Sequence, residues 1–213
     1  MASPPILDAV TRFPVVTLMQ PTLVHRPFHR EGWVYEEKYD GWRMVAYKDG
    51  KNVRFISRAG RDQAWRFPDL VSAIRTLPAK TLILDGELVR LDQQLISRIE
   101  WLGRRRKNET ATPALFMVFD CLYAHRQDLR GQALRVRRHV LELEAGGQHL
   151  LSPARRLADD GLSAWTEVLE RGYEGLVAKD PASPYRSGRT LSWLKVKVPH
   201  YREGERRRDS RRK

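Results

Sequence analysis

The sequence contains only one cysteine, so an internal disulfide bond is excluded. Cys121 lies in the apolar segment LFMVFDCLY, which predicts a buried, unreactive thiol rather than a catalytic one. The six histidines form no zinc-type cluster, and the one close pair, His25 and His29, flanks Pro27, which disrupts a helical ligand face. We therefore expect no zinc site.

Long apolar runs are also missing. No segment approaches the length that spans a bilayer, and the N-terminus lacks the pattern of a signal peptide. Glycine-rich phosphate loops of the GxxxxGKS/T or GxGxxG type do not occur either, so any nucleotide chemistry must use another device. We expect a cytoplasmic, nucleoid-associated protein with no membrane partner.

Negative charge is scarce relative to positive charge. The 213 residues hold 39 Lys and Arg against 26 Asp and Glu, a formal net charge of +13. Such an excess favours polyanionic partners, because phosphate backbones attract Lys and Arg over a long range. An acidic protein partner, or solubility alone, would account for the same charge.

The chain divides into three parts by composition. Residues 1–32 are expected to form an extended lead-in, because several prolines should break any regular element there. Residues 33–200 are expected to form one domain, since this length can bury a core. Residues 201–213 hold seven Lys or Arg against three Asp or Glu, without apolar periodicity, which predicts a basic, disordered tail.

The domain has a strand-rich texture. WVYEEK, WRMVAYK and NVRFIS are separated by Asp40-Gly41 and Asp49-Gly50, which predicts two consecutive hairpins. Further strands are expected in TLILDGELVRLD, ALFMVFDCLY, GLVAKD and SWLKVKV. Apolar residues at helical spacing predict helices over 64–77, 134–144 and 163–171, and the basic stretch 104–107 is expected to be a surface loop. This pattern indicates an α+β fold built on antiparallel hairpins.

The segment EEKYDGWR places Lys38 at the end of a strand, with a turn that returns Arg43 close to it. A lysine acts as a nucleophile only when neutral, and nearby cations or desolvation lower its pKa enough to help. Lys38 and Arg43 could share one phosphate. A hairpin with a solvated lysine would produce the same pattern.

Strand parity supplies further candidates. In SWLKVKV, Trp193, Lys195 and Lys197 share one face, and two lysines on a buried sheet require a polyanion, although an amphipathic edge strand looks similar. Asp85 and Glu87 also project together, so this pair could hold a divalent cation or a ribose hydroxyl, unless Asp85-Gly86 is only a turn.

Glu174 and Lys179 belong to the segment YEGLVAK. Ideal alternation would place these two side chains on opposite faces of one strand. They can act together only if the strand contains a bulge or if Glu174 lies just outside it.

Taken in order, these segments resemble the covalent nucleotidyltransferases, above all the ATP-dependent DNA ligases of the bacterial ligase D type. EKYDGWR resembles the KxDGxR signature of that family, and FISRAGRD resembles its SRxGxD segment. LDGELV, FMVFDCLY, YEGLVAK and SWLKVK resemble the motifs that follow, so the resemblance covers roughly residues 33–198. It implies an ATP-grasp-like nucleotidyltransferase (adenylation) domain over residues 33–200, with antiparallel sheets flanked by helices.

The resemblance also implies roles for single residues. Lys38 would attack ATP and carry AMP as a covalent adduct, while Phe119 would stack on the adenine. Glu36 and the backbone of Glu37 would border the base. The cations that would contact the ribose, the phosphates, the departing pyrophosphate or the nick are Arg43, Arg58, Lys179, Lys195 and Lys197.

The implied cofactors are ATP and a divalent cation, Mg²⁺ or Mn²⁺. Glu87 would bind the ribose or the metal, and Glu174 would assist in metal binding. The family then transfers AMP to a 5′-phosphate, and the neighbouring 3′-hydroxyl attacks to seal the strand. Nicked duplex DNA is the implied substrate of a monomeric enzyme, with a separate end-binding protein or polymerase as a further candidate partner.

Two alternatives stay open. RNA ligases and capping guanylyltransferases share the lysine chemistry, although SRAGRD and FDCLY favour a DNA ligase. A non-catalytic nucleic-acid-binding module would also fit the charge, although every motif lysine is intact.

The family normally continues into an OB-fold domain that carries a sixth, basic motif. We expect no OB-fold domain within these residues. Either the tail replaces it, a separate protein supplies its function, the sequence is part of a longer chain, or the domain performs only part of the cycle. We expect the basic tail to act mainly as a DNA tether.

Overall fold

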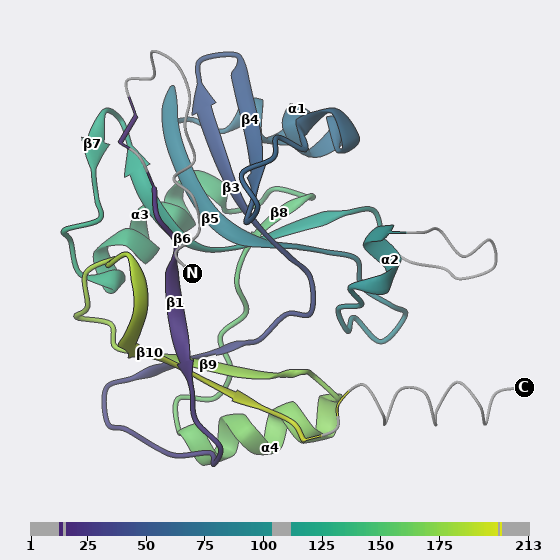
Figure 1. The fold of residues 1–213 in the computed structure, drawn as a ribbon, viewed down its shortest axis with the longest axis vertical. Coiled ribbons are helices and arrows are strands. Elements are labelled where there is room, and N and C mark those ends of the chain that lie inside the picture. The colour runs from purple at the N-terminus through teal and green to yellow at the C-terminus, as the bar shows by residue number, and fades with distance from the viewer. Residues whose placement is uncertain (1–12, 15, 104–111, 200, 202–213) are drawn as a thin grey trace, which may run out of the picture.

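The protein is described by a computed structural model that covers residues 13, 14, 16–103, 112–199 and 201. Its strands form two sheets (Figure 1). The small sheet has the order β1 (Met19–Leu23), β10 (Gly188–Lys197), β9 (Gly175–Lys179) and β2 (Val34–Glu37). The large sheet has the order β4 (Asn52–Ser57), β3 (Trp42–Asp49), β5 (Thr81–Val89), β6 (Leu115–Ala124) and β7 (Gln127–Asp128), with β8 (Leu151–Pro153) also paired to β6.

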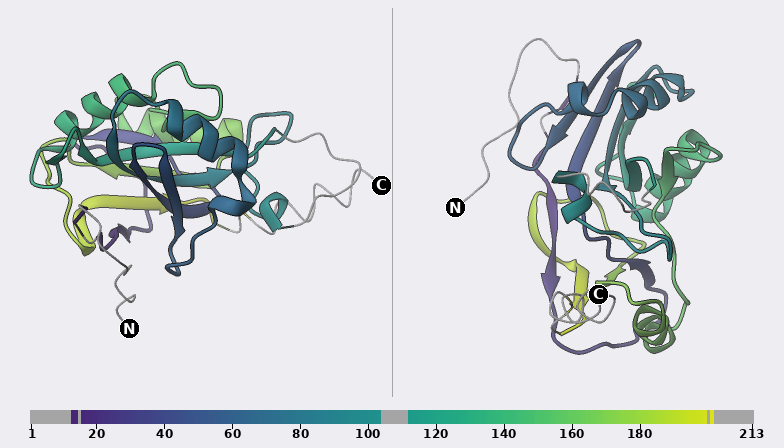
Figure 2. Two further views of the ribbon diagram at one scale, coloured as in Figure 1. Left: turned by 90° about the horizontal axis from the view of Figure 1, so that it is seen from above. Right: turned by 90° about the vertical axis from the view of Figure 1, so that its right-hand side faces the viewer.

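Most strand pairs are antiparallel, as the sequence predicts. The exceptions in the described part of the chain are β1 with β10 and β6 with β8, which run parallel. In Figure 1 and in the right-hand view of Figure 2, the large sheet lies above the small sheet. The expected α+β fold with antiparallel sheets and few helices is confirmed.

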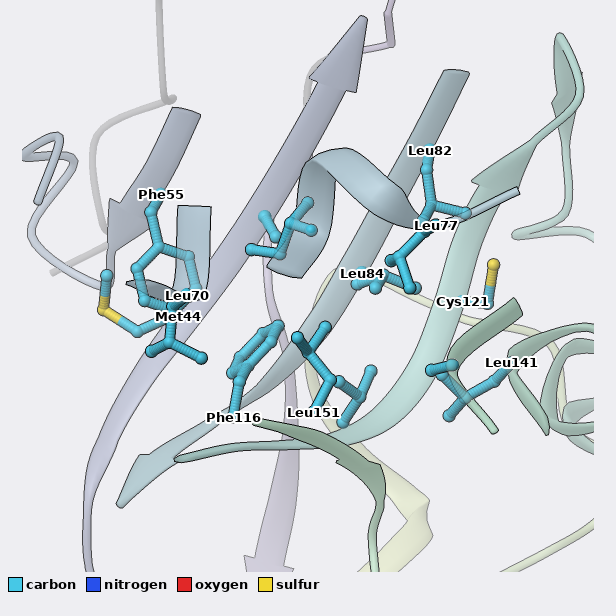
Figure 3. Close-up of a cluster of buried hydrophobic side chains, with 14 of the residues drawn as sticks. Met44, Phe55, Leu70, Leu77, Leu82, Leu84, Phe116, Cys121, Leu141 and Leu151 are labelled. Carbon is cyan, nitrogen blue, oxygen red and sulfur yellow. The ribbon is translucent and has the colours of Figure 1, made fainter. Parts of the chain in front are cut away.

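The main core lies between the large sheet and two helices, α1 (Pro68–Thr76) and α3 (Leu134–Ala145). Figure 3 shows Phe55 from β4 beside Leu70 from α1, and Cys121 from β6 near Leu141 from α3. Burying one such side chain contributes about 1.5–3 kcal/mol. This cluster therefore holds the large sheet rigid and leaves its opposite face for other contacts.

The small sheet is covered by α4 (Gly161–Arg171), whose Ala164 and Val168 pack against Leu176 and Val196. The Asp160 side chain caps this helix by accepting hydrogen bonds from two backbone N–H groups of its first turn. The remaining short helices are α2 (Glu100–Gly103) and the 3-10 helix η1 (Ala64–Arg66).

The first of the two predicted hairpins is wrong. Asp49-Gly50 joins β3 to β4 as expected, but β2 pairs with β9 and not with β3, so Asp40-Gly41 carries the chain from one sheet to the other. A Cβ on Gly41 would lie 2.2 Å from the carbonyl oxygen of Leu88. Glycine is required here because the crossing chain packs directly on β5.

The expectation that prolines exclude any regular element from residues 1–32 is also wrong. Met19–Leu23 forms β1, an edge strand of the small sheet, with a register shift between Pro21 and Thr22. Proline is tolerated on an edge strand at such an irregularity, because its missing N–H removes no central ladder bond.

The other predicted elements are found close to their expected positions. LDGELV lies within one strand, so Asp85-Gly86 is not a turn. The helix expected over 64–77 consists of η1 and α1. The basic stretch 104–107 and the tail after Tyr201 lie outside the described residues. Across the described ranges, no helix has the length and apolar character needed to cross a membrane.

Candidate active site

A cavity of about 200 Å³ is lined by residues from both sheets. Nine of the eleven site residues expected from the sequence line it. They are Glu36, Glu37, Lys38, Arg43, Arg58, Glu87, Phe119, Lys179 and Lys195. Glu174 is outside this lining but contacts Lys38, and Lys197 reaches the site through Glu174.

Lys38 follows the last residue of β2, and its backbone N–H donates to the carbonyl of Gly175 at 3.0 Å. Its Nζ donates to Glu174 Oε2 at 2.6 Å, and Lys197 Nζ lies 2.8 Å from Glu174 Oε1. Glu174 therefore lies between two ammonium groups. It precedes β9, which is one of the two arrangements expected from the sequence, the other being a bulge.

The close approach of β9 to β10 brings these groups together. A Cβ on Gly175 would lie 2.0 Å from the carbonyl oxygen of Val196, so only glycine allows the two strands to come this near. Lys197 is paired with Gly175 at the same end of the two antiparallel strands, so its side chain reaches the neighbouring Glu174.

The buried wall of the cavity carries Lys179. Its Nζ lies 2.5 Å from Glu36 Oε2, and 4.3 Å and 4.8 Å from the ring centroids of Trp193 and Phe119. Burial lowers the pKa of Lys179, although the nearby Glu36 opposes this shift. The second carboxylate oxygen of Glu36 lies 3.2 Å from Arg138 on α3. Glu36 is therefore held by two cations.

Arg43 lines the cavity, but Asp85 fixes its guanidinium. Arg43 Nε and Nη2 donate to the two oxygens of Asp85 at 2.5 Å and 2.6 Å, and the Tyr185 hydroxyl donates to the same carboxylate at 2.6 Å. Arg43 also lies 4.4 Å from the centroid of the Phe119 ring. Asp85 thus acts as an anchor for Arg43 rather than as half of the metal-binding pair considered from the sequence.

Glu36 and Glu37 project from opposite faces of β2. The Glu37 carboxylate is buried and lies 3.2 Å from Arg155, with Arg171 and Glu167 of α4 among the charged groups that influence it. Burial raises the pKa of Glu37 to about 7, and Arg155 opposes this shift. The Glu37 side chain therefore points away from that of Glu36, towards Arg155.

The pKa values of two cavity residues, Glu87 and Lys195, are shifted. Burial raises the pKa of Glu87 to about 7, against the opposing effects of Arg43 and Lys38. Burial also lowers the pKa of Lys195, and Lys38 and Lys197 lower it further. A site in which cations crowd one another in this way favours a bound polyanion.

The described residues contain no group of three or more His, Cys, Asp or Glu side chains that could hold a metal ion. Of the two expected metal ligands, Glu174 is ion-paired with Lys38 and Lys197, and Glu87 is half-buried near Arg43. These two carboxylates fit a divalent cation only if further oxygen ligands come from a bound nucleotide or water.

Several cavity residues were not predicted from the sequence. Leu18, Gln20 and Pro21 come from β1 and the residue before it. Val177 also lines the cavity, and parity with Lys179 along β9 would have identified it. By contrast, β1 reaches the site only because it pairs in parallel with β10. The sequence of β1 alone does not predict this pairing.

Comparison with known proteins identifies a family and several similar chains. The family model described as "ATP dependent DNA ligase domain" matches residues 17–197. The multifunctional non-homologous end joining protein LigD of Pseudomonas aeruginosa is 34% identical over 178 residues, which cover 83% of this chain and 21% of that protein. DNA ligase C1 of Mycolicibacterium smegmatis is 31% identical over 212 residues, which cover 93% of this chain and 60% of that protein.

Among solved structures, a mycobacterial DNA ligase D complexed with ATP and MES is similar, with a TM-score of 0.73 and 30% identity. The match covers 85% of this chain and 60% of that one. This chain therefore spans between about a fifth and three fifths of the length of these relatives. From the matched residues and the shared fold, the chain belongs to the family of ATP-dependent DNA ligase domains.

Proposed function

We propose that this chain is the catalytic domain of an ATP-dependent DNA ligase and that Lys38 carries AMP as a covalent adduct. One observation carries the proposal: in a chain of this family, Lys38 lies on the wall of a cavity that also presents Lys179, Lys195 and an aromatic ring, Phe119. This combination suits a triphosphate joined to a flat base.

The proposed first step is the transfer of AMP to the enzyme. The neutral Lys38 amine forms a bond to the α-phosphorus of ATP, while the bond from that phosphorus to the bridging oxygen breaks and pyrophosphate leaves. The amine must first lose a proton, and the Glu174 carboxylate at 2.6 Å is placed to accept it. Lys195 and Lys197 then offset the charge that develops on the departing pyrophosphate.

The proposed binding roles follow the geometry of the cavity. The adenine lies against Phe119, bordered by Glu36 and by the backbone of Glu37. Arg43, held rigidly by Asp85, contacts the ribose or phosphates. Lys179 contacts the α-phosphate, for which it would exchange part of its pairing with Glu36.

The remaining two cavity roles concern the metal and the nick. Glu87 and Glu174 would hold a divalent cation together with phosphate oxygens, and this cation would supply further charge stabilisation. Arg58, exposed at the cavity, would contact the nicked strand.

The second half of the proposed cycle uses DNA. AMP moves from Lys38 to a 5′-phosphate at a nick, and the adjacent 3′-hydroxyl attacks that phosphate and releases AMP. Because one relative is named for non-homologous end joining, we place this activity in DNA repair, with a separate end-binding protein or polymerase as partner. We further propose that the chain acts as a monomer, in the cytoplasm and near the nucleoid.

Mass spectrometry after incubation with ATP and magnesium tests the first step. The wild-type protein should gain the mass of one AMP, and Lys38→Ala should gain none. Lys80→Ala, which removes an exposed lysine away from the cavity lining, is the matched control and should gain AMP normally. A wild-type protein that never acquires the adduct would refute the proposal and favour a non-catalytic binding module.

Nick sealing by the purified chain tests the second step. ATP and GTP should be compared first, then nicked DNA and nicked RNA. The proposal predicts sealing with ATP and nicked DNA. Preferential use of GTP, or sealing confined to RNA, would favour the capping or RNA ligase alternatives.

A further inference from the structure

Trp65 is the most exposed large hydrophobic side chain in the described part of the chain, at 79%. It belongs to η1, which follows β4 at the edge of the large sheet. Burying a tryptophan ring is strongly stabilising, because the ring has a large apolar surface, and an exposed ring lacks this stabilisation. Such an exposed ring is typical of a surface that binds a partner.

The segment that presents Trp65 is well ordered by its own hydrogen bonds. Asp62 Oδ1 accepts from the backbone N–H groups of Phe55 at 3.1 Å and Ala64 at 3.0 Å. The neighbouring Phe67 is buried against the main core. These contacts fix the turn, and the Trp65 side chain is exposed on it.

The segment 58–66 that carries Trp65 also carries three arginines. Arg58, Arg61 and Arg66 are all exposed, and the Arg66 guanidinium lies 5.0 Å from the Trp42 ring centroid and 6.0 Å from that of Trp65. The one acidic residue of the segment 58–66, Asp62, is turned towards its own backbone and lies 3.5 Å from Arg54. The surface is therefore cationic and aromatic at once.

This surface adjoins the cavity. Arg58 lines the cavity, and its backbone N–H donates to the carbonyl of Arg43 at 3.2 Å. Arg66 itself lies on Trp42, which packs against the main core on the face of the large sheet opposite to Arg43. Arg58 therefore connects the cavity with the segment 58–66, which carries Trp65.

We propose that Trp65, with Arg58, Arg61 and Arg66, binds an unpaired nucleotide of the DNA strand next to the break. The ring would stack on a base while the arginines contact neighbouring phosphates. The base must be unpaired because bases inside an intact duplex are already stacked on one another. This inference rests on the proposed function for its DNA substrate.

Fluorescence anisotropy with labelled short oligothymidine tests the proposal on the full chain. Trp65→Ala should weaken binding about tenfold, the effect of losing one base-stacking contact. Trp65→Phe, which keeps an aromatic ring, should recover most of the affinity. Arg135→Ala on α3 is the charge-matched control for Arg61→Ala, and only the latter should weaken binding and its salt dependence.

Two outcomes would overturn the proposal: oligothymidine affinity equal to wild type in Trp65→Ala, or equal losses in Trp65→Phe and Trp65→Ala. Thermal unfolding of each variant checks the fold, and little change is expected because Trp65 is exposed. Failure of the ligase proposal itself would show separately, as a wild-type protein that gains no AMP.

Arg155, which lies outside the cavity lining, supports a second and independent inference. Its backbone carbonyl accepts from Glu37 N–H at 3.1 Å, and its backbone N–H donates to the Tyr39 hydroxyl at 3.0 Å. Its guanidinium lies 3.2 Å from the Glu37 carboxylate and donates to the Tyr173 hydroxyl. Arg155 thus touches both chain neighbours of Lys38.

Tyr173 is the residue before Glu174, so the same arginine also reaches the chain neighbour of the Lys38 partner. We infer that Arg155 is a positioning residue that holds the Lys38 segment in register with Glu174. The guanidinium acts on the lysine through the Glu37 carboxylate on one side and the Tyr173 hydroxyl on the other. The inference rests on the proposed function only for its assay.

Single-turnover adenylation measured over a range of ATP concentrations tests this inference. Arg155→Ala should slow AMP transfer at saturating ATP by about tenfold, the scale of one misplaced catalytic group, with little change in the ATP concentration for half-maximal rate. Arg155→Lys should recover part of the rate. Arg156→Ala removes the exposed neighbouring arginine and should behave as wild type.

An unchanged rate in Arg155→Ala, or a change confined to the ATP concentration dependence, would refute a positioning role. Failure of the ligase proposal is again distinguishable, because wild type would then form no adduct at all.

Discussion

Replacing Glu37 by glutamine should alter how the stability of the protein depends on pH. Burial raises the pKa of the Glu37 carboxyl from its ordinary 4.5 to about 7. The unfolded chain releases this proton near pH 4.5, whereas the folded protein keeps it until about pH 7. Between these values the folded state binds more protons, so the free energy of unfolding falls as pH rises.

The size of the effect follows from the two pKa values. Their difference corresponds to about 3 kcal/mol of stability that is fully present below pH 4.5 and lost as pH rises through about 7. The physical cause is a buried carboxylate that becomes charged with Arg155 as its nearest cation. Glutamine never ionises, so Glu37→Gln should not suffer this loss.

Urea unfolding at about pH 5 and about pH 8 measures the difference. The free energy of unfolding of Glu37→Gln minus that of wild type should rise by up to about 3 kcal/mol from the lower to the higher pH. Glu87 also has a raised pKa, but it is present in both proteins and its contribution cancels. Glu170→Gln, at an exposed position of α4, is the matched control. A Glu37→Gln difference that is the same at both pH values would refute the reasoning.

Three further predictions concern the scaffold. Arg137→Met leaves the fully buried Asp120 without its ion-pair partner, so urea unfolding should show a loss of about 3–5 kcal/mol; a loss below about 1 kcal/mol would contradict this. Gly41→Ala places a methyl group 2.2 Å from the Leu88 carbonyl oxygen and should cost about 1–3 kcal/mol, and an unchanged Tm would count against it. Cys121 is buried and burial raises its thiol pKa, so a thiol reagent should label it only in denaturant; labelling of the native protein would disprove this.

The sequence by itself determined the local chemistry of the site. Alternation along β10 correctly placed Trp193 and Lys195 on one face, because successive side chains of a strand point to opposite sides whatever the partner strand is. The same parity required either a bulge or a Glu174 just outside β9, and the second arrangement is found. The motif order identified nine residues that the fold brings around one cavity.

The tertiary structure alone decided which strands meet and which charges pair. Lys38 and Glu174 are 136 residues apart in the chain, yet their side chains are in contact. β2 pairs with β9 instead of forming a local hairpin, and β1 pairs with β10. Both pairings depend on which faces of the strands are buried together. A pattern within one strand carries no information on that choice, because any neighbour with a matching apolar face satisfies it.

The partners of the charged groups follow the same rule. Glu36 meets Arg138, and Arg43 is held by Asp85. Helix α3 supplies Arg138 only because it packs on the large sheet. Residue type and spacing thus specified the reactive groups, whereas long-range burial specified their neighbours, since a buried charge must find its counter-ion wherever the packed chain places one.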